Sequence, residues 1–209
     1  MMATEPREPL VVIVSGPSGS GKSTLVEKIL ELPGTLLSIS RTTRPPRKTE
    51  SDGKWYNFVS DEEFQQMAER GEFLEHARVF GRHSYGTPRK SLEEARSRGL
   101  DLVLEIDVQG AAQVKKKVPA AIAIFILPPS RQELEKRIRA RGQDSEDEIK
   151  RRLERARQEL ERYREYDFVV VNDNLQRASG DVQAIVLGAR CRVGRNEDRV
   201  QQILKSFGG

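Results

Sequence analysis

The sequence predicts an α/β fold of three layers, with a central parallel sheet between two layers of helices. Short β-branched runs alternate with helical patterns over most of the chain, which is typical of parallel strands joined by helical crossovers. The first such run leads directly into a glycine-rich turn and a helix. Residues 41–91 break the alternation with short strands around one helix. We therefore expect one compact unit that carries a small mixed α+β insertion.

Composition bounds the class of protein. The chain has 209 residues, and its 36 Lys and Arg interleave with 32 Asp and Glu to give a formal net charge of +4. We interpret most of these charges as solvated helix faces and expect no nucleic-acid partner. No run approaches the roughly 18 apolar residues that span a bilayer, and Glu5, Arg7 and Glu8 stand where a signal peptide would be apolar. We therefore expect a cytoplasmic protein with no membrane partner. The single cysteine, Cys191, excludes an internal disulfide.

The first half of the chain predicts two strands, a helix and the insertion. Residues 10–15 form a buried β-branched strand, and a helix follows from residue 22 to about residue 32. A second strand at residues 36–40 leads into the basic loop 41–47, where adjacent prolines oppose regular structure and display the loop on the surface. Within the insertion we expect strands at 56–59 and 73–79 and a helix that begins with the capping box 60–63.

The second half resumes the alternation. The expected elements are a helix at 88–98, a strand at 102–106, a helix at 109–117, a strand at 121–127, two charged helices that begin with capping boxes at 130–133 and 145–148, a strand at 168–171, and helices on either side of Gly194. On the second charged helix an apolar face is formed by Ile149, Leu153, Ala156, Leu160 and Tyr163. We expect Arg151, Arg155 and Glu159 on its opposite, wet face.

The glycine-rich turn carries the strongest chemical signal. It matches G-x-x-x-x-G-K-[ST], and it lies where that motif acts, between an apolar strand and a helix. Its backbone N–H groups and the helix N-terminus suit phosphate oxygens, Lys22 reaches the β- and γ-phosphates, and Ser23 ligates Mg²⁺. The residues predicted to bind ATP here are Gly16, Pro17, Ser18, Gly19, Ser20, Gly21, Lys22, Ser23 and Thr24. Spacing alone leaves the site of the phosphate acceptor open: Arg44 and Arg47 either clamp a phosphate or belong to a solvated basic loop.

Nine strings resemble guanylate kinases and occur in the order seen in that family. They are GPSGSGKS, SISRTTRPPR, DGKWYNFVS, FLEHARVFG, YGTP, LEIDVQG, FILPPS, RIRARG and VVVNDN. The resemblance implies a P-loop NTPase-type fold and Mg-dependent phosphoryl transfer from ATP to GMP. It also implies a flexible tail at 1–9, a nucleotide-binding core at 10–40, 92–130 and 165–192, a GMP-binding insertion at 41–91, lid helices at 131–164 and a C-terminal helix at 193–209.

The resemblance also assigns the acceptor site. The implied substrate-binding residues are Ser40, Arg44, Arg47, Tyr56, Glu75, Tyr85, Gly86, Thr87, Glu105 and Asp107. Among these, Glu75 and Thr87 read the guanine edge, and a carboxylate suits that edge because it accepts from both the ring N–H and the amino group. We expect Glu105 and Asp107 on one face of their strand, since side chains alternate along a strand.

The resemblance assigns the catalytic cations as well. They are Lys22, Arg44 and the lid arginines Arg137, Arg141 and Arg152, and Asn172 is implied to lie near the adenine. One departure is the loop Arg82-His83-Ser84, which is one residue longer than the form typical of the family. We expect His83 to be an exposed loop residue.

Two other functions stay open. The chain could be a P-loop kinase with another small-molecule acceptor, against which Glu75 and Thr87 argue. It could also be a non-catalytic guanylate-kinase-like module that binds phosphopeptides, against which the intact Lys22 and Ser23 argue. We expect a monomer or a homodimer.

Overall fold

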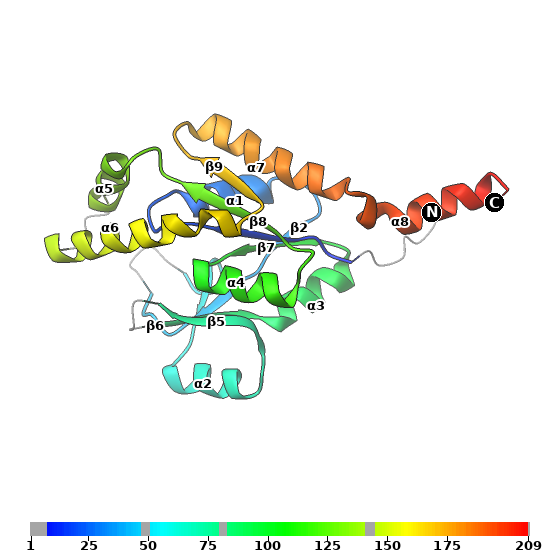
Figure 1. Cartoon of the computed structure of the whole chain (residues 1–209). Helices are drawn as coiled ribbons and strands as arrows, with labels where there is room; N and C mark the ends of the chain where they lie inside the picture. Colours follow the sequence, from blue (N-terminus) through cyan, green and yellow to red (C-terminus); the bar gives the residue numbers. More distant parts are fainter. Residues whose placement is uncertain (1–7, 47–50, 80–82, 141–144, 209) are drawn as a thin grey trace.

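The structure is a computed structural model that describes residues 8–46, 51–79, 83–140 and 145–208. Its centre is a parallel sheet with the strand order β2-β7-β1-β8-β9 (Figure 1). The strands are β1 Val11–Ser15, β2 Thr35–Leu37, β7 Asp101–Glu105, β8 Ile122–Leu127 and β9 Phe168–Val171. Every residue of β1 is buried, as expected for a strand covered on both faces.

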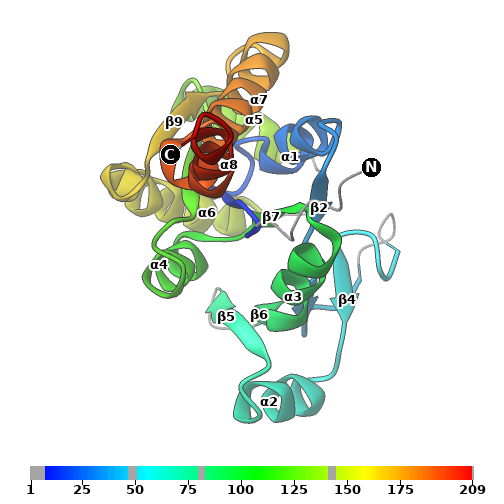
Figure 2. The same ribbon diagram turned by 90° about the vertical axis from the view of Figure 1, so that its right-hand side faces the viewer.

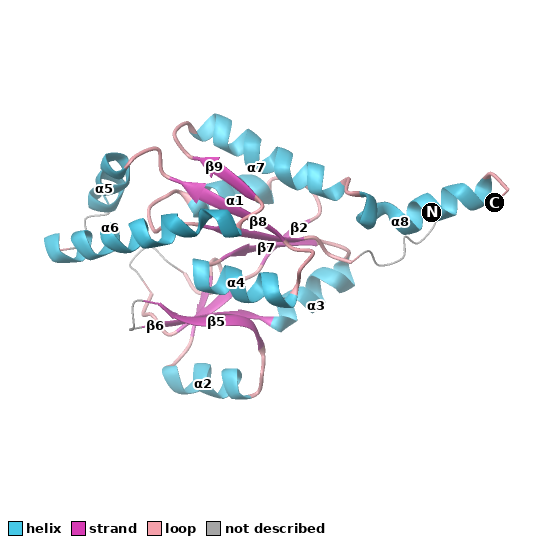
Figure 3. Cartoon of the chain, in the orientation of Figure 1, coloured by secondary structure: helices cyan, strands magenta, loops and turns pink. Residues whose placement is uncertain are grey.

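Helices cover both faces of this sheet (Figure 3). On one face lie α1 Lys22–Leu30 and α7 Leu175–Arg190, which share a buried cluster with the sheet. On the other face lie α3 Arg89–Arg98 and α4 Val108–Lys117, which share a second buried cluster. The three-layer α/β/α fold expected from the sequence is confirmed.

A second, mixed sheet lies beyond α3 and α4 (Figure 2). Its strand order is β4-β3-β6-β5, and only β3 and β4 run parallel. The strands are β3 Ser40–Thr42, β4 Tyr56–Phe58, β5 Phe73–Val79 and β6 His83–Pro88. Helix α2 Asp61–Glu69 packs against it through Phe64 and Met67, and Ser60 Oγ accepts a hydrogen bond from the Glu63 N–H, as the capping box predicted.

The remaining helices lie at the two ends of the molecule (Figure 1). Helices α5 Arg131–Ala140 and α6 Glu146–Leu160 pack together, and a 3₁₀ helix at Glu161–Glu165 follows. Helix α8 Val193–Ser206 projects from the body and has no buried residue. It contains Gly194, so the break between the last helices falls at Cys191 and Arg192 instead. None of the helices in the described ranges combines the length and apolar character that crossing a membrane requires.

The expectation of one strand at 36–40 followed by a basic loop is wrong. Strand β2 ends at Leu37 in the first sheet, and β3 begins at Ser40 in the second. The chain thus changes sheets within two residues, which an unbroken strand pattern does not reveal. Thr42, the last residue of β3, is fully buried. The two adjacent prolines come after this strand, so they do not prevent it from forming.

Strand β6 was not predicted, because its Tyr-Gly-Thr-Pro run resembles a turn. It pairs with β5 in antiparallel register, with Glu75 opposite Thr87 and Ala77 opposite Tyr85. A Cβ on Gly86 would lie 2.7 Å from the Phe73 ring, so the glycine serves close packing between strands. His83 begins this strand and is half-buried, so the expectation of an exposed loop residue is wrong.

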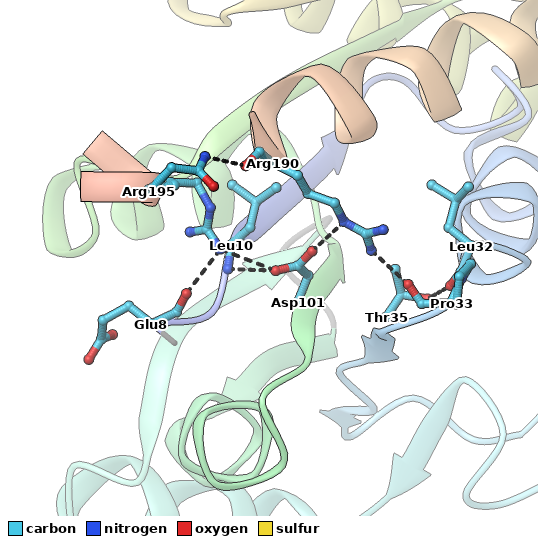
Figure 4. A network of polar contacts seen from close by, with 9 residues as sticks. Glu8, Leu10, Leu32, Pro33, Thr35, Asp101, Arg190 and Arg195 are labelled. Atoms are coloured by element: carbon cyan, nitrogen blue, oxygen red, sulfur yellow. Dashed lines mark hydrogen bonds and ion pairs between the residues drawn. The ribbon is translucent and has the colours of Figure 1, made fainter. Parts of the chain in front are cut away.

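Asp101, at the start of β7, ties the root of α8 to the first sheet (Figure 4). Its carboxylate accepts hydrogen bonds from the Leu10 N–H at 3.0 Å, from Arg190 Nε at 2.7 Å and from Arg195 at 3.4 Å. Arg190 also donates to the Pro33 carbonyl oxygen at 3.0 Å, and Arg195 donates to that of Glu8 at 3.0 Å. One buried carboxylate therefore joins the chain before β1 to both C-terminal helices.

Replacing this carboxylate should destabilise the protein. In Asp101→Ala the two guanidinium groups and a buried N–H lose their shared acceptor, and we expect the free energy of unfolding to fall by about 2–4 kcal/mol. Urea denaturation followed by circular dichroism measures it. The control is Glu94→Ala, which removes an exposed pair with Arg98 and should cost less than about 1 kcal/mol. Equal effects of the two substitutions would contradict the assignment.

Candidate active site

The turn between β1 and α1 is built for close approach by backbone groups. Gly16, Gly19 and Gly21 have positive φ values of 136°, 93° and 95°. A Cβ on Gly16 would lie 2.4 Å from the Ile126 carbonyl oxygen, and one on Gly21 would lie 2.1 Å from the Asn172 side-chain nitrogen. Glycine is therefore required by both conformation and space, and the first turn of α1 follows directly. This arrangement of N–H groups and helix N-terminus suits an anion.

Two side chains of α1 supply a cation and a hydroxyl at this turn. Lys22 Nζ donates to the carbonyl oxygens of Gly16 at 2.8 Å and Pro17 at 3.1 Å. Its ammonium group thus lies on the loop itself, where it can reach a bound phosphate. Ser23 Oγ donates to Glu105 Oε1 at 2.8 Å, across the gap between α1 and the end of β7.

Asn172 and Arg137 brace the same turn. Asn172 is buried, and its side-chain nitrogen donates to the Ser20 carbonyl oxygen at 2.8 Å. Arg137 donates to the carbonyl oxygens of Asn172 at 3.0 Å and Ser20 at 3.4 Å, and it pairs with Glu133 at 3.0 Å. Both side chains hold the turn in the described conformation, and their roles toward adenine and the transferred phosphoryl group stay predictions.

Arg44 is held by aromatic residues of the second sheet. Its guanidinium carbon lies 5.6 Å from the centre of the Tyr56 ring and 5.7 Å from that of Phe58, and its Nε donates to the Tyr85 hydroxyl at 3.2 Å. The rings of Tyr56 and Tyr85 meet edge to face, with centroids 5.8 Å apart. A preoriented guanidinium beside two tyrosine side chains provides a suitable receptor for a phosphate dianion.

Glu75 is the most unusual ionisable group of this sheet. Its side chain is buried, and Thr87 Oγ1 donates to its Oε1 at 2.6 Å. Burial raises the pKa of Glu75 to about 7, although the Thr87 hydrogen bond opposes that rise. A carboxylate with one oxygen satisfied inside the protein and a desolvated charge is well suited to bind a ligand that offers N–H groups.

Glu105 and Asp107 meet the cavity from different elements. Glu105 is the last residue of β7, whereas Asp107 is the N-cap of α4 and accepts from the N–H groups of Gln109 at 3.0 Å and Gly110 at 2.9 Å. The expectation that both lie on one face of a strand is therefore wrong, because the strand ends between them. Both nevertheless line the same cavity, at the carboxyl edge of the parallel sheet.

One cavity of about 490 Å³ joins the glycine-rich turn to the second sheet. Of the residues predicted from the sequence, it is lined by Gly16, Ser18, Gly19, Gly21, Lys22, Ser23, Thr24, Ser40, Arg44, Tyr56, Glu75, Tyr85, Glu105, Asp107 and Arg152. Pro17, Ser20, Gly86, Thr87, Arg137 and Asn172 do not line it. Arg47 and Arg141 lie outside the described residues.

Sequence reasoning missed the ion pair between Arg155 and Glu159 beside this cavity. Glu159 lines it, and Arg155 pairs with Glu159 at 2.8 Å and with Asp107 at 3.7 Å. The expectation that Arg155 and Glu159 are wet is wrong, since their side chains are only 23% and 12% exposed. Helix α6 packs on α5 with its apolar face and turns the neighbouring face toward α4. Only the four-residue spacing of the ion pair signals this in the sequence.

The fold and the cavity define a class of protein. The first strand of a parallel sheet opens into a phosphate-binding turn with a lysine, and the facing wall of the same cavity carries an arginine and a buried carboxylate on a separate sheet. A donor phosphate site and a separate acceptor site that share one cavity are the arrangement of a P-loop kinase.

Comparisons with known proteins give the family. The guanylate kinase family model matches residues 8–188. A guanylate kinase of Caldanaerobacter subterraneus is 48% identical over 193 residues, which cover 92% of this chain and 93% of that protein. One of Escherichia coli K12 is 47% identical over 198 residues, covering 93% and 95% of the two chains. The crystal structure of guanylate kinase from Anaplasma phagocytophilum matches with a TM-score of 0.77 at 34% identity, over 90% of each chain.

The chain belongs to the guanylate kinase family. It is a nucleoside monophosphate kinase, a phosphotransferase whose substrates are nucleotides, as the sequence predicted.

Proposed function

We propose that the chain transfers the γ-phosphoryl group of Mg-ATP to GMP, giving ADP and GDP. One observation carries the choice of acceptor: the buried Glu75, fixed by Thr87, lines the same cavity as Lys22 of the glycine-rich turn. The carboxylate can accept from guanine N1–H and from the exocyclic amino group at once, whereas adenine presents no such pair of donors on that edge. The base therefore binds at Glu75, and the phosphate of GMP binds at Arg44, Tyr56 and Tyr85.

Mg²⁺ fits the residues at the glycine-rich turn. The Ser23 hydroxyl and the Glu105 carboxylate lie 2.8 Å apart, and both are oxygen groups of the kind that this ion prefers. Few protein ligands suffice, because nucleotide-bound Mg²⁺ takes most of its ligands from phosphates and water. Ser23 would hold the ion directly, with Glu105 beside it. When bound, the ion neutralises charge on the β- and γ-phosphates.

The reaction requires little covalent chemistry from the protein. A GMP phosphate oxygen is already ionised near neutral pH, so it attacks the γ-phosphorus while the bond to the ADP oxygen breaks, and no general base is needed. The protein aligns the two nucleotides, which contributes on the order of 7–11 kcal/mol toward the barrier. Lys22 and Arg152, both at the cavity, stabilise the charge on the transferring group. Catalytic roles for Arg137 and Arg141 are proposed on the family resemblance alone. Of these two, Arg141 lies outside the described residues.

A coupled ADP-release assay with Mg-ATP and each of GMP, AMP, UMP and CMP tests this proposal. We expect turnover with GMP alone. Turnover with another monophosphate in preference to GMP would favour a kinase with a different acceptor. Binding of Mg-ATP without turnover on any acceptor would favour the non-catalytic interaction module. The cytoplasmic location stays a prediction from the sequence.

The affinity for GMP should depend on pH through Glu75. Only the ionised carboxylate accepts both guanine hydrogen bonds, and with a pKa of about 7 most of it is protonated at pH 6. We expect the KM for GMP to rise about tenfold between pH 8 and pH 6, while the KM for ATP changes little. The phosphate of GMP also titrates near pH 6. Glu75→Gln retains that phosphate effect, so it isolates the part due to the carboxyl group.

A further inference from the structure

Two residues of α4 hold the strand that carries Glu75. Gln113 and His76 exchange two hydrogen bonds: the Gln113 amide nitrogen donates to the His76 carbonyl oxygen at 2.8 Å, and the His76 N–H donates to Gln113 Oε1 at 3.3 Å. Lys117 Nζ donates to the Leu74 carbonyl oxygen at 2.6 Å. The bonded residues of β5 thus stand immediately before and after Glu75.

These contacts complete an edge that would otherwise lack partners. Strand β5 is at the edge of the second sheet, where backbone N–H and C=O groups have no neighbouring strand. The side chains of Gln113 and Lys117 take the place of that strand. The Leu74 side chain is buried in the same cluster as Ala111 and Val114 of α4, so apolar packing holds the two elements together as well.

Gly110 completes the α4 surface that faces Glu75. A Cβ on Gly110 would lie 2.5 Å from Glu75 Oε2 and 2.9 Å from its carboxyl carbon. Gly110, Gln113 and Lys117 follow one another at spacings of three and four, which puts them on one face of the helix. The same helix begins at its N-cap, Asp107, which lines the cavity with Glu75. One helix therefore carries one carboxylate and fixes the backbone around the other.

We propose that Gln113 and Lys117 are positioning residues for base recognition. They clamp β5 to α4, so that the Glu75 carboxylate meets the guanine edge at a fixed place relative to Asp107. Gly110 provides the space for that carboxylate. The inference rests on the proposed function, because it concerns how Glu75 reads the acceptor base. Neither side chain touches the cavity, so each acts through Glu75.

The test compares two acceptors that differ only at the base edge. Inosine 5′-monophosphate retains the ring N–H of guanine but lacks the amino group, so the ratio of kcat/KM for GMP to that for inosine monophosphate reports how well Glu75 accepts the second hydrogen bond. Gln113→Met retains the side-chain length and removes both hydrogen bonds to His76. We expect the KM for GMP to rise about tenfold and the acceptor ratio to fall at least about threefold, with the KM for ATP changed less than about twofold.

Further variants separate positioning from general destabilisation. Lys117→Met should shift the acceptor ratio in the same direction, whereas Lys116→Met, an equal loss of charge at the adjacent exposed position, should leave it unchanged. Gly110→Ala should lower the ratio by displacing the carboxylate. A loss of stability alone would reduce rates with both acceptors equally and leave the ratio as it is.

Each outcome decides between the inference and the function it rests on. If the wild type phosphorylates GMP and Gln113→Met, Lys117→Met and Gly110→Ala all keep the wild-type ratio, the clamp is overturned and the proposed function stands. If the wild type does not act on GMP, both fall. A lowered ratio in these three variants, with that of Lys116→Met unchanged, supports the clamp.

Discussion

Lys22→Met should lower kcat by roughly 1,000-fold while ATP still binds. The backbone N–H groups of the glycine-rich turn, held open by three glycines with positive φ, remain in place and still contact the phosphates. The ammonium group is different, because it neutralises charge that grows on the phosphoryl group as it leaves ADP. Its removal therefore affects the transition state more than the bound nucleotide, and kcat should fall far more than the affinity for ATP changes.

A lysine on the same helix provides the control for this variant. Lys28 lies in the last turn of α1 and pairs with Glu31 at 2.6 Å on the surface, so Lys28→Met removes the same charge away from the cavity. It should leave kcat within about twofold. Lys22 also donates to two carbonyl oxygens of its own loop, so melting temperatures of both variants should be compared. A kcat for Lys22→Met within tenfold of the wild type would remove Lys22 from the catalytic group.

The sequence predicted the first sheet well except for β2, because the hydrophobic pattern of the other strands agrees with their burial in the fold. Strands β1, β8 and β9 are apolar runs that each precede a helix, and each was placed within a residue of its observed bounds. The donor site follows from the same agreement, since strand, glycine-rich turn and helix are contiguous. One printed contact of this site with a distant segment is the hydrogen bond from Ser23 to the Glu105 carboxylate.

The acceptor side was harder to predict because its geometry arises between distant segments. Arg44 and Tyr85 meet across paired strands, and β6 carries residues that favour turns. Without the family resemblance, Glu75 has no distinguishing local signal, since its burial results from packing against α4 and β6. The same applies to Arg155, whose partners lie one turn along α6 and at the start of α4.

Glu75→Gln should lower kcat/KM for GMP by roughly 100- to 1,000-fold, with little change in the KM for ATP. The substitution preserves shape, and the amide oxygen can still accept from Thr87 Oγ1, which lies 2.6 Å from the carboxylate in the wild type. The amide NH₂ group would then face the N–H donors of guanine, so one hydrogen bond becomes a contact between two donors. AMP, with which we expect no turnover, presents a ring nitrogen acceptor at that edge, so its binding should not weaken and the binding preference for GMP over AMP should shrink.

An exposed carboxylate next to β5 supplies the matched control. Glu72 pairs with Arg70 at the surface, and Glu72→Gln removes an equal charge without touching the cavity. Its kcat/KM for GMP should stay within about twofold of the wild type. If Glu75→Gln also stayed within that range, the guanine edge would be read elsewhere and the assignment of the acceptor base to this wall would be lost.

Glu75→Gln should be more stable than the wild type although it is less active. Because the folded-state pKa of Glu75 is raised from 4.5 to about 7, ionisation is harder in the folded protein than in the unfolded chain. The group's contribution to stability is therefore fully present below pH 4.5 and is lost as the pH rises through 7.

A neutral glutamine avoids the cost of a buried charge, so at pH 8 Glu75→Gln should raise the free energy of unfolding by about 1–3 kcal/mol. Denaturation at pH 8 and pH 5 measures this gain in the free energy of unfolding, which should diminish at the lower pH. If Glu75→Gln were less stable than the wild type at pH 8, the carboxylate would not be desolvated. Lower activity combined with higher stability is expected when a buried charge is retained for recognition of the substrate.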